Sequence, residues 1–201
     1  INEGSIIDLI TTIRNARDEN TPLVIIGGPP CQAYSLAKRS RMRKPIEGLH
    51  GEELKKALDE NDERIDKYLS DERHDLYAHY LKIIHETEPD AFVYENVPGI
   101  LTAQKRSGED SKEYIIDLFN NDLNIKAGGY EFISVDSPTE IRSSFDDDKT
   151  RYFKDFIVDA SDYGIPQKRK RFILIGIRSS LKNNKKGLNF QKKFETAVSH
   201  Y

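Results

Sequence analysis

The chain has 201 residues, enough for one domain with a sizeable core and too few for a modular multidomain enzyme. Its 31 lysines and arginines stand against 34 aspartates and glutamates, a net charge of −3, so the whole chain is not a polycation that binds nucleic acid without specificity. No apolar run approaches the ~20 residues that cross a bilayer, which argues against a membrane-spanning protein. The single cysteine, Cys31, excludes an internal disulfide and a multi-cysteine zinc site and fits a reducing compartment.

The ends of the chain carry no targeting or terminating feature. The sequence starts at Ile1 without an initiator methionine, a signal peptide or a lipidation motif, and residues 194–201 stop without a recognisable terminus. We therefore expect the chain to be a piece of a longer protein.

The first predicted elements are a helix, a turn and a strand. Isoleucines recur at helical spacing over residues 6–13, residues 20–22 break the pattern, and the apolar run 23–26 predicts a buried strand. Residues 27–30, Gly-Gly-Pro-Pro, end this strand because the prolines supply no backbone donors and the glycines allow a sharp change of direction. Cys31 therefore lies just beyond the tip of the strand.

Two segments interrupt an alternation of helices and strands. A highly charged insertion at about 39–75 keeps a helical period, which predicts one surface helix or a pair of helices, and an acidic loop is expected at about 137–151. The remaining apolar patterns predict a helix over 76–84, a strand over 91–94, a helix around 114–119 and a strand over 130–135. They also predict a late antiparallel hairpin, in which 156–158 pairs with 172–177 and the turn lies at 164–166.

This alternation predicts an α/β fold with a mainly parallel sheet. In such sheets, ligands bind beyond the carboxyl ends of the strands. The strand over 91–94 runs into Glu95 and Asn96. Cys31 and Glu95 are therefore expected at one edge of the sheet.

Cys31 is the centre of the functional prediction. A lone cysteine is most often a small buried hydrophobe, but a cysteine that follows Gly-Gly-Pro-Pro on a strand-to-loop turn does not easily belong to a core. The segment 27–35, Gly-Gly-Pro-Pro-Cys-Gln-Ala-Tyr-Ser, resembles the nucleophile motif of the cytosine-5 DNA methyltransferases.

Two further motifs support this resemblance, in the order that the family requires. Residues 95–99, Glu-Asn-Val-Pro-Gly, resemble its Glu-Asn-Val motif. Residues 167–171, Gln-Lys-Arg-Lys-Arg, follow Asp-Tyr-Gly-Ile-Pro and resemble its Gln-x-Arg-x-Arg motif. The resemblance implies a Rossmann-like methyltransferase fold that depends on S-adenosylmethionine, with residues 1–201 as the central part of one catalytic domain.

The implied reaction transfers a methyl group to carbon 5 of a cytosine flipped out of double-stranded DNA. Carbon 5 is a poor nucleophile until a thiolate adds to carbon 6, and Cys31 supplies this thiolate. Glu95 holds or shares a proton at ring N3, and Arg171 stabilises the base carbonyl O2. Arg169 faces a DNA phosphate or helps to fix the nucleophile loop. Alone, a strand-end carboxylate is often a helix cap and an Arg-Lys cluster a solvated face, so the prediction depends on the three motifs together.

The resemblance also implies supporting roles for nearby polar residues. Asn96 tethers the nucleophile loop through its amide, and Gln167 orients the neighbouring arginines. Gln32 and Ser35 are candidates for contacts with the surroundings of the flipped nucleotide and with a phosphate, and each is equally compatible with a loop cap.

The methyl donor is a point of departure from the family. The sequence lacks the glycine-rich Phe-x-Gly-x-Gly turn and the acidic residue that holds the ribose, so only Pro30 and Leu76 are expected to contact S-adenosylmethionine, and the chain alone is expected to be inactive. Tyr34 stands where phenylalanine is usual. Lys38 replaces a glycine, and lysine resists backbone angles that glycine permits.

Several alternatives stay open from the residues. The motifs contact the base and its immediate backbone, so they do not separate DNA from transfer RNA. One alternative is a non-catalytic regulatory homologue, but such proteins commonly lack the nucleophile or the arginines, and this sequence keeps both. Another is a cysteine hydrolase, but this enzyme needs a histidine base, and no histidine lies near Cys31 in the sequence. The spacing of the histidines predicts no metal site. A bacterial, cytoplasmic enzyme is favoured over a nuclear one because no chromatin-reading module accompanies the motifs.

Overall fold

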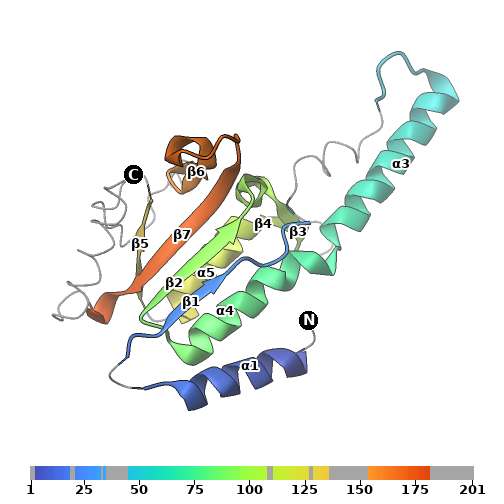
Figure 1. The fold of residues 1–201 in the computed structure, drawn as a ribbon. Helices are drawn as coiled ribbons and strands as arrows, with labels where there is room; N and C mark the ends of the chain where they lie inside the picture. The colour runs from blue at the N-terminus through green and yellow to red at the C-terminus, as the bar shows by residue number, and fades with distance from the viewer. Residues whose placement is uncertain are drawn as a thin grey trace.

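The computed structural model describes residues 3–18, 21–32, 34, 45–107, 111–126, 129–135 and 154–181. At its centre is a five-stranded sheet with the hydrogen-bonded order β1-β2-β7-β5, in which β6 also pairs with β7 (Figure 1). The strands of this sheet are β1 (Val24–Gly27), β2 (Ala91–Asn96), β5 (Tyr130–Ile133), β6 (Ile157–Asp159) and β7 (Lys170–Arg178).

One reversed strand makes the sheet mixed. β1 and β2 are parallel, with Gly27 opposite Tyr94, whereas β7 is antiparallel to β2, β5 and β6. The expectation of a mainly parallel sheet is therefore corrected. Four of the described strands share a direction, but β7 lies between β2 and β5 and makes the pairings on both of its sides antiparallel.

The late hairpin is confirmed. β6 pairs with the start of β7, with Ile157 opposite Phe172. The connection contains the 3-10 turn η3 (Ala160–Tyr163) and then Gly164, whose φ of 77° lies in the left-handed region that glycine adopts without strain.

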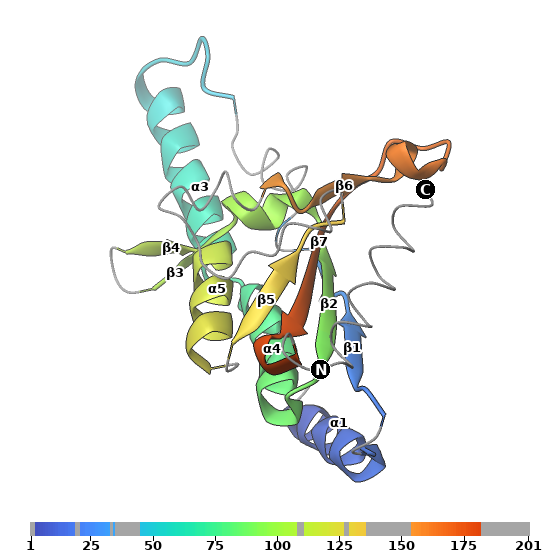
Figure 2. The same cartoon turned by 90° about the vertical axis from the view of Figure 1, so that its left-hand side faces the viewer.

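Two helices cover one face of the sheet. The predicted helices are confirmed as α4 (Leu76–Thr87) and α5 (Ile115–Lys126), and Figure 2 shows both on the same side of the strands. Side chains alternate between the faces of a strand, so every second residue of β2 and β7 points under these helices. The core between the two layers contains the fully buried side chains Ile84, Phe92, Tyr94, Phe119 and Phe172.

The first helix packs outside this layer. α1 (Glu3–Ala16) contacts α4, and Ile6 and Ile10 form a small apolar cluster with Ile83. Arg14 Nη2 also pairs with Glu86 Oε2 at 2.6 Å. The predicted helix over 6–13 is confirmed, although Ile7 is half-exposed rather than part of the buried stripe.

The first strand is less buried than its sequence predicts. Ile26 is 75% exposed and Val24 is 40% exposed, so the expectation of a buried strand is wrong for this face. Only Ile25, whose side chain points to the opposite face, packs against the core. Val24 and Ile26 point to the sheet face opposite to that of Ile25, and among the described residues nothing buries them there.

The charged insertion forms one long helix in its described part. α3 (Gly51–Leu69) extends away from the sheet (Figure 1) and is followed by the 3-10 helix η1 (Glu72–Asp75), which leads into α4. Residues 39–44 lie outside the described residues, as does the acidic loop expected at about 137–151.

A small second sheet joins α3 to the rest of the molecule. After the 3-10 helix η2 (Pro98–Thr102), β3 (Gln104–Arg106) pairs antiparallel with β4 (Lys112–Tyr114), which no sequence pattern predicted. Two basic residues of β3 contact neighbouring elements: Arg106 pairs with Asp66 of α3, and Lys105 pairs with Asp75 of η1.

Candidate active site

Three chain segments meet at one edge of the sheet. β1 ends at Gly27, and β2 ends two residues beyond the level of Gly27, at Asn96. β7 runs the other way, so its first residues, with Phe172 opposite Asn96, lie at this same edge. The loop after β1, the end of β2 and the start of β7 therefore bring the three motifs together, and we call this region the carboxyl edge.

Glu95 and Arg171 form the polar centre of the carboxyl edge. Arg171 Nε lies 2.8 Å from Glu95 Oε1, with 23% of the Arg171 side chain and 45% of the Glu95 side chain exposed. Both residues lie on the sheet face opposite to Tyr94 and Phe172, because side chains alternate along each strand. Arg171 Nη1 also donates to the carbonyl of Lys170 at 2.8 Å. The pair thus presents a carboxylate and a guanidinium side by side, both reachable from solvent.

The loop after β1 passes directly against Glu95. A Cβ on Gly28 would lie 2.8 Å from Glu95 Oε2 and 3.4 Å from the Glu95 carbonyl oxygen. Asn96, which is 1% exposed, donates from Nδ2 to the carbonyl of Pro29 at 3.3 Å and accepts from the amide of Val97 at 2.9 Å. Glycine permits the close approach, and the amide of Asn96 holds the next residue of the loop.

Cys31 follows on the same loop. It is half-buried and does not belong to the core cluster. Its carbonyl accepts a hydrogen bond from the amide of Tyr34 at 3.0 Å, which closes a turn. Within this turn Gln32 is exposed, and its Oε1 accepts from Arg73 Nη1 at 3.0 Å. Ser35 lies outside the described residues.

The loop before β7 presents the basic motif to solvent. Residues 166–170, which include Gln167 and Arg169, are exposed. The amide of Gln167 donates to the carbonyl of Ile165 at 2.7 Å. Glu95 and Arg171 are thus brought into contact, whereas Arg169 and Gln167 extend outward beside them.

Asp159 fixes the base of this loop. Its Oδ1 accepts from the amide of Ser161 at 3.2 Å, from the Ser161 hydroxyl at 3.0 Å and from the amide of Arg169 at 3.0 Å. These donors, the Ser161 amide first among them, lower the pKa of the Asp159 carboxyl. A carboxylate here ties the two ends of the loop together and sets where Arg169 emerges.

The two residues expected to contact the methyl donor lie at element ends. Pro30 is exposed in the loop after β1, and Leu76 is the partly buried first residue of α4. Both are apolar and neither supplies a charged or hydrogen-bonding side chain. These two residues could pack against part of the methyl donor, but they do not form a complete binding site for it.

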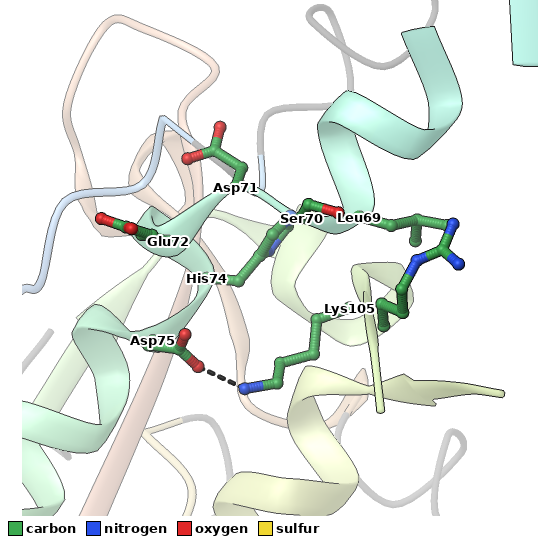
Figure 3. A pocket seen from close by; sticks show the side chains of 8 residues that line it. Leu69, Ser70, Asp71, Glu72, His74, Asp75 and Lys105 are labelled. Atoms are coloured by element: carbon green, nitrogen blue, oxygen red, sulfur yellow. Dashed lines mark hydrogen bonds and ion pairs between the residues drawn. The ribbon is translucent and has the colours of Figure 1, made fainter. Parts of the chain in front are cut away.

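A separate cavity of about 360 Å³ lies between the end of α3, η1 and β3 (Figure 3). The Asp75–Lys105 ion pair crosses it, and the ring of His74, 1% exposed, lies in its wall with Nε2 2.9 Å from the carbonyl of Tyr68. None of the residues predicted as catalytic lines it. Within the described ranges, no group of three or more His, Cys, Asp or Glu side chains is arranged to hold a metal ion.

Three contributors to the carboxyl edge were not predicted from the sequence. The pattern Asp159-x-Ser161 is a local signal for a side-chain-capped turn and could have identified the first of them. Arg73 carries no comparable signal, because its partner Gln32 is 41 positions away. Gly28 belongs to the predicted nucleophile motif, but its contact with Glu95, which explains why a side chain is excluded there, has no sequence signal.

Comparison with known proteins identifies the family. A family model described as "C-5 cytosine-specific DNA methylase" matches residues 63–131 and 141–200, more than half of the chain. The matched ranges contain Glu95, Arg169 and Arg171, and Cys31 precedes them.

Individual relatives agree with this match. The chain is 36% identical over 159 residues to type II methyltransferase M.Bpa9945I of Bacillus paralicheniformis, covering 79% of this chain and 26% of the relative. It is 31% identical to type II methyltransferase M.XorII of Xanthomonas oryzae pv. oryzae, with 79% of this chain and 24% of the relative covered. It is 30% identical to DNA (cytosine-5-)-methyltransferase M.ApeKI of Aeropyrum pernix, with 79% of this chain and 27% of the relative covered. The chain spans about a quarter of the length of these relatives.

The order of the motifs, the carboxyl edge that they build and these matches lead to one conclusion: the chain belongs to the C-5 cytosine-specific DNA methylase family.

Proposed function

We propose that a longer protein containing this chain methylates carbon 5 of cytosine in double-stranded DNA, with Cys31 as the nucleophile. The observation that supports this most directly is the 2.8 Å contact between Arg171 and Glu95, beside Gly28 of the loop that carries Cys31. A thiol, a carboxyl group and a guanidinium are the three groups that the reaction needs around one pyrimidine ring.

Each group has a distinct task. The Cys31 thiolate forms a bond to carbon 6, and the electron pair of the 5,6 double bond becomes available at carbon 5. Glu95 holds a proton at N3, and Arg171 donates to O2, where electron density increases. S-adenosylmethionine, which the family uses, supplies an electrophilic methyl group. After methylation, carbon 5 loses its proton to a base and the bond between sulfur and carbon 6 breaks, which regenerates Cys31.

Donor binding is proposed to need residues beyond these 201. Pro30 and Leu76 would contact part of the donor, but the sequence has no glycine-rich turn or ribose-binding acid of the family type. The apolar face of β1, where Ile26 is 75% exposed, is consistent with a site that other parts of a longer protein complete. We therefore propose that this chain alone binds the donor weakly and does not turn over.

DNA is the proposed nucleic acid. The three relatives are named as DNA or type II methyltransferases, and none of these names mentions RNA. The exposed basic residues 168–170 and Gln32 offer donors for phosphates next to the flipped base. We propose that the enzyme belongs with the type II modification enzymes and acts in the bacterial cytoplasm. No helix that the structure describes is long and apolar enough to span a membrane.

Covalent trapping tests the proposal. A longer protein carrying this chain should form an adduct with duplex DNA that contains 5-fluorocytosine at the target position, because fluorine cannot leave carbon 5 as a cation and the sulfur bond therefore persists. The adduct should survive a denaturing gel, depend on S-adenosylmethionine and disappear in Cys31→Ala. Tyr130→Phe, which changes a buried hydroxyl far from the carboxyl edge, is the control and should trap normally. Adduct formation by Cys31→Ala at the parent's rate would reject the nucleophile assignment.

The 201-residue chain gives a second test. Titration calorimetry should detect weak S-adenosylmethionine binding or none. Tight binding would show that the donor site is contained in this chain, contrary to the proposal.

A further inference from the structure

The turn that carries Cys31 is fastened to η1 at two points. From one side, Arg73 Nη1 donates to Gln32 Oε1 at 3.0 Å. From the other, the Tyr34 hydroxyl donates to the carbonyl of His74 at 3.0 Å. Both partners belong to a four-residue 3-10 helix about 40 positions downstream, so these contacts fix where the turn lies relative to the sheet.

Tyr34 is the stronger of the two attachments. Its side chain is fully buried in the main core, and its ring centroid lies 5.8 Å from that of His74. Burial raises the pKa of the hydroxyl, which therefore keeps its proton and acts as a donor. A buried hydroxyl without a partner is costly. The His74 carbonyl thus provides the partner that the Tyr34 hydroxyl needs, and the Tyr34 amide in turn donates to the carbonyl of Cys31.

Arg73 is held in place before it reaches Gln32. Asp71 precedes η1 and accepts from both the amide of Arg73, at 3.1 Å, and its Nε, at 2.7 Å. The guanidinium is therefore oriented by its own neighbour. The Arg73 side chain is partly exposed, and so is its hydrogen bond to Gln32. We therefore expect this bond to hold the Cys31 turn less strongly than the buried hydrogen bond of Tyr34 does.

The opposite end of the loop has a different anchor. Asn96, at the end of β2, donates to the carbonyl of Pro29, two residues before Cys31. The loop is therefore held at its start by the sheet and after Cys31 by η1. The second anchor, unlike the first, uses a side-chain hydroxyl of the turn itself, that of Tyr34.

We propose that η1 positions the nucleophile, with Tyr34 and Arg73 as positioning residues that hold the Cys31 turn in place. The structural claim stands independently, whereas its consequence for catalysis rests on the proposed function. Neither side chain takes part in bond formation in this proposal.

Alkylation of Cys31 tests the structural claim directly, because Cys31 is the only cysteine of the chain. The rate of reaction with iodoacetamide is measured from pH 6 to pH 9 for the 201-residue chain and for Tyr34→Phe. Loss of a buried hydrogen bond changes a local opening equilibrium by about fivefold. We therefore expect Tyr34→Phe to react about fivefold faster at every pH, with the same midpoint of the pH profile.

The matched control is Tyr130→Phe. Tyr130 is also buried and donates its hydroxyl to a backbone carbonyl, that of Pro89, at the other end of the strands. It should leave Cys31 reactivity unchanged. If Tyr34→Phe reacts within twofold of Tyr130→Phe, or more slowly, η1 does not hold the turn and the proposal is overturned.

Arg73 is tested by graded replacement. Arg73→Ala should raise Cys31 reactivity by less than Tyr34→Phe does, and Arg73→Lys, which retains a donor for Gln32, should restore most of the parent's rate. Equal rates for Arg73→Ala and the parent would remove Arg73 from the proposal.

The catalytic consequence is measured in a longer protein carrying the chain. With saturating donor and 5-fluorocytosine DNA, Tyr34→Phe should slow adduct formation about fivefold while the dissociation constant for DNA stays the same. Unchanged alkylation together with normal trapping would defeat this inference and leave the proposed function standing. Faster alkylation of Tyr34→Phe combined with trapping by Cys31→Ala would defeat the proposed function and leave the anchor standing.

Discussion

The two ends of the central strands use polar side chains in different ways. At the amino end of β2, Asp90 Oδ2 accepts from the amide of Leu23 at 2.8 Å, and the carbonyl of Pro89 receives both the Tyr130 hydroxyl at 2.8 Å and Arg178 Nε at 3.2 Å. Most of these contacts are to the backbone and close the turns between elements, and Arg178 Nη1 also lies 3.5 Å from the exposed Glu88 carboxylate. We call this end the amino edge.

At the carboxyl edge the polar groups face each other and solvent instead. Glu95 and Arg171 pair side chain to side chain with 45% and 23% exposure, and the basic residues before β7 extend outward. An exposed ion pair adds little to stability. The comparison shows that the polar groups of the amino edge mainly bond to the backbone, whereas those of the carboxyl edge bond to each other within reach of solvent.

Removing Arg171 should have the largest effect at either edge, and that effect should be kinetic. Loss of one preorganised donor to a developing charge slows reactions by about 100-fold or more, so Arg171→Ala in a longer protein should trap 5-fluorocytosine DNA at least that much more slowly. The free energy of unfolding should change by less than about 1 kcal/mol. Single-turnover trapping and urea unfolding measure the two. Equal trapping by variant and parent would end the distinction between the edges.

Substitutions at two glycines, Gly176 in the core and Gly28 at the carboxyl edge, should affect stability and catalysis differently. A Cβ at Gly176 would lie 2.2 Å from Phe92 Cε1 inside the core, whereas a Cβ at Gly28 would lie 2.8 Å from Glu95 Oε2 at the end of a movable side chain. Gly176→Ala should therefore lower the free energy of unfolding by about 1–3 kcal/mol. Gly28→Ala should lower it clearly less in urea unfolding but should slow trapping by displacing Glu95. The reverse order of stability losses would contradict this assignment.

At the amino edge, Asp90→Ala should lower the stability of the fold without affecting the reaction. The variant leaves the amide of Leu23 without its acceptor, which should lower the free energy of unfolding by about 1 kcal/mol. Asp90→Asn retains an acceptor oxygen and serves as the control, with a smaller loss. Trapping of 5-fluorocytosine DNA by a folded Asp90→Ala protein should remain normal, and a tenfold slower reaction would show that this edge also serves the chemistry.

The smallest effect is a dependence of stability on pH that arises near η1. Burial lowers the pKa of His74 below its usual value of 6.5. As the pH falls below 6.5, His74 therefore binds a proton more readily in the unfolded chain than in the folded chain. Stability should be complete above pH 6.5 and should fall as the pH drops below that value, by no more than about 1.4 kcal/mol per pH unit from this residue. His74→Gln should flatten the dependence between pH 7.5 and 5.5 in urea unfolding. Parallel profiles for His74→Gln and the parent would refute the role of His74.

The helix–strand units were predictable because their signals are local. The apolar spacing of residues 76–84 and the short run 91–94 predicted α4 and β2, which the structure confirms. The pairing of β6 with β7 was also predicted, since a turn-forming segment separates two apolar runs. Periodicity within one segment is sufficient for such elements.

Strand order and burial were not predictable in the same way. That β7 lies between β2 and β5 depends on pairings distant in the sequence, and the apolar run of β1 gives no sign that Ile26 faces outward. The three-residue strand β3 is polar, and its ion pairs with α3 and η1 come from partners 30 and 40 positions away. Within the site, the position of the motifs at strand ends predicted that Cys31 and Glu95 would share an edge, while the hydrogen bond from Tyr34 to His74 required the folded chain.

The outward face of β1 has a consequence for handling the protein. Among the described strands β1 pairs with β2 alone, and its Ile26 is 75% exposed. A strand at a sheet edge that also exposes apolar side chains favours strand addition from another molecule. In concentrated solution the chain should therefore tend to associate edge to edge, and charged substitutions such as Ile26→Lys are the natural way to keep it monodisperse, because this side chain points away from the core.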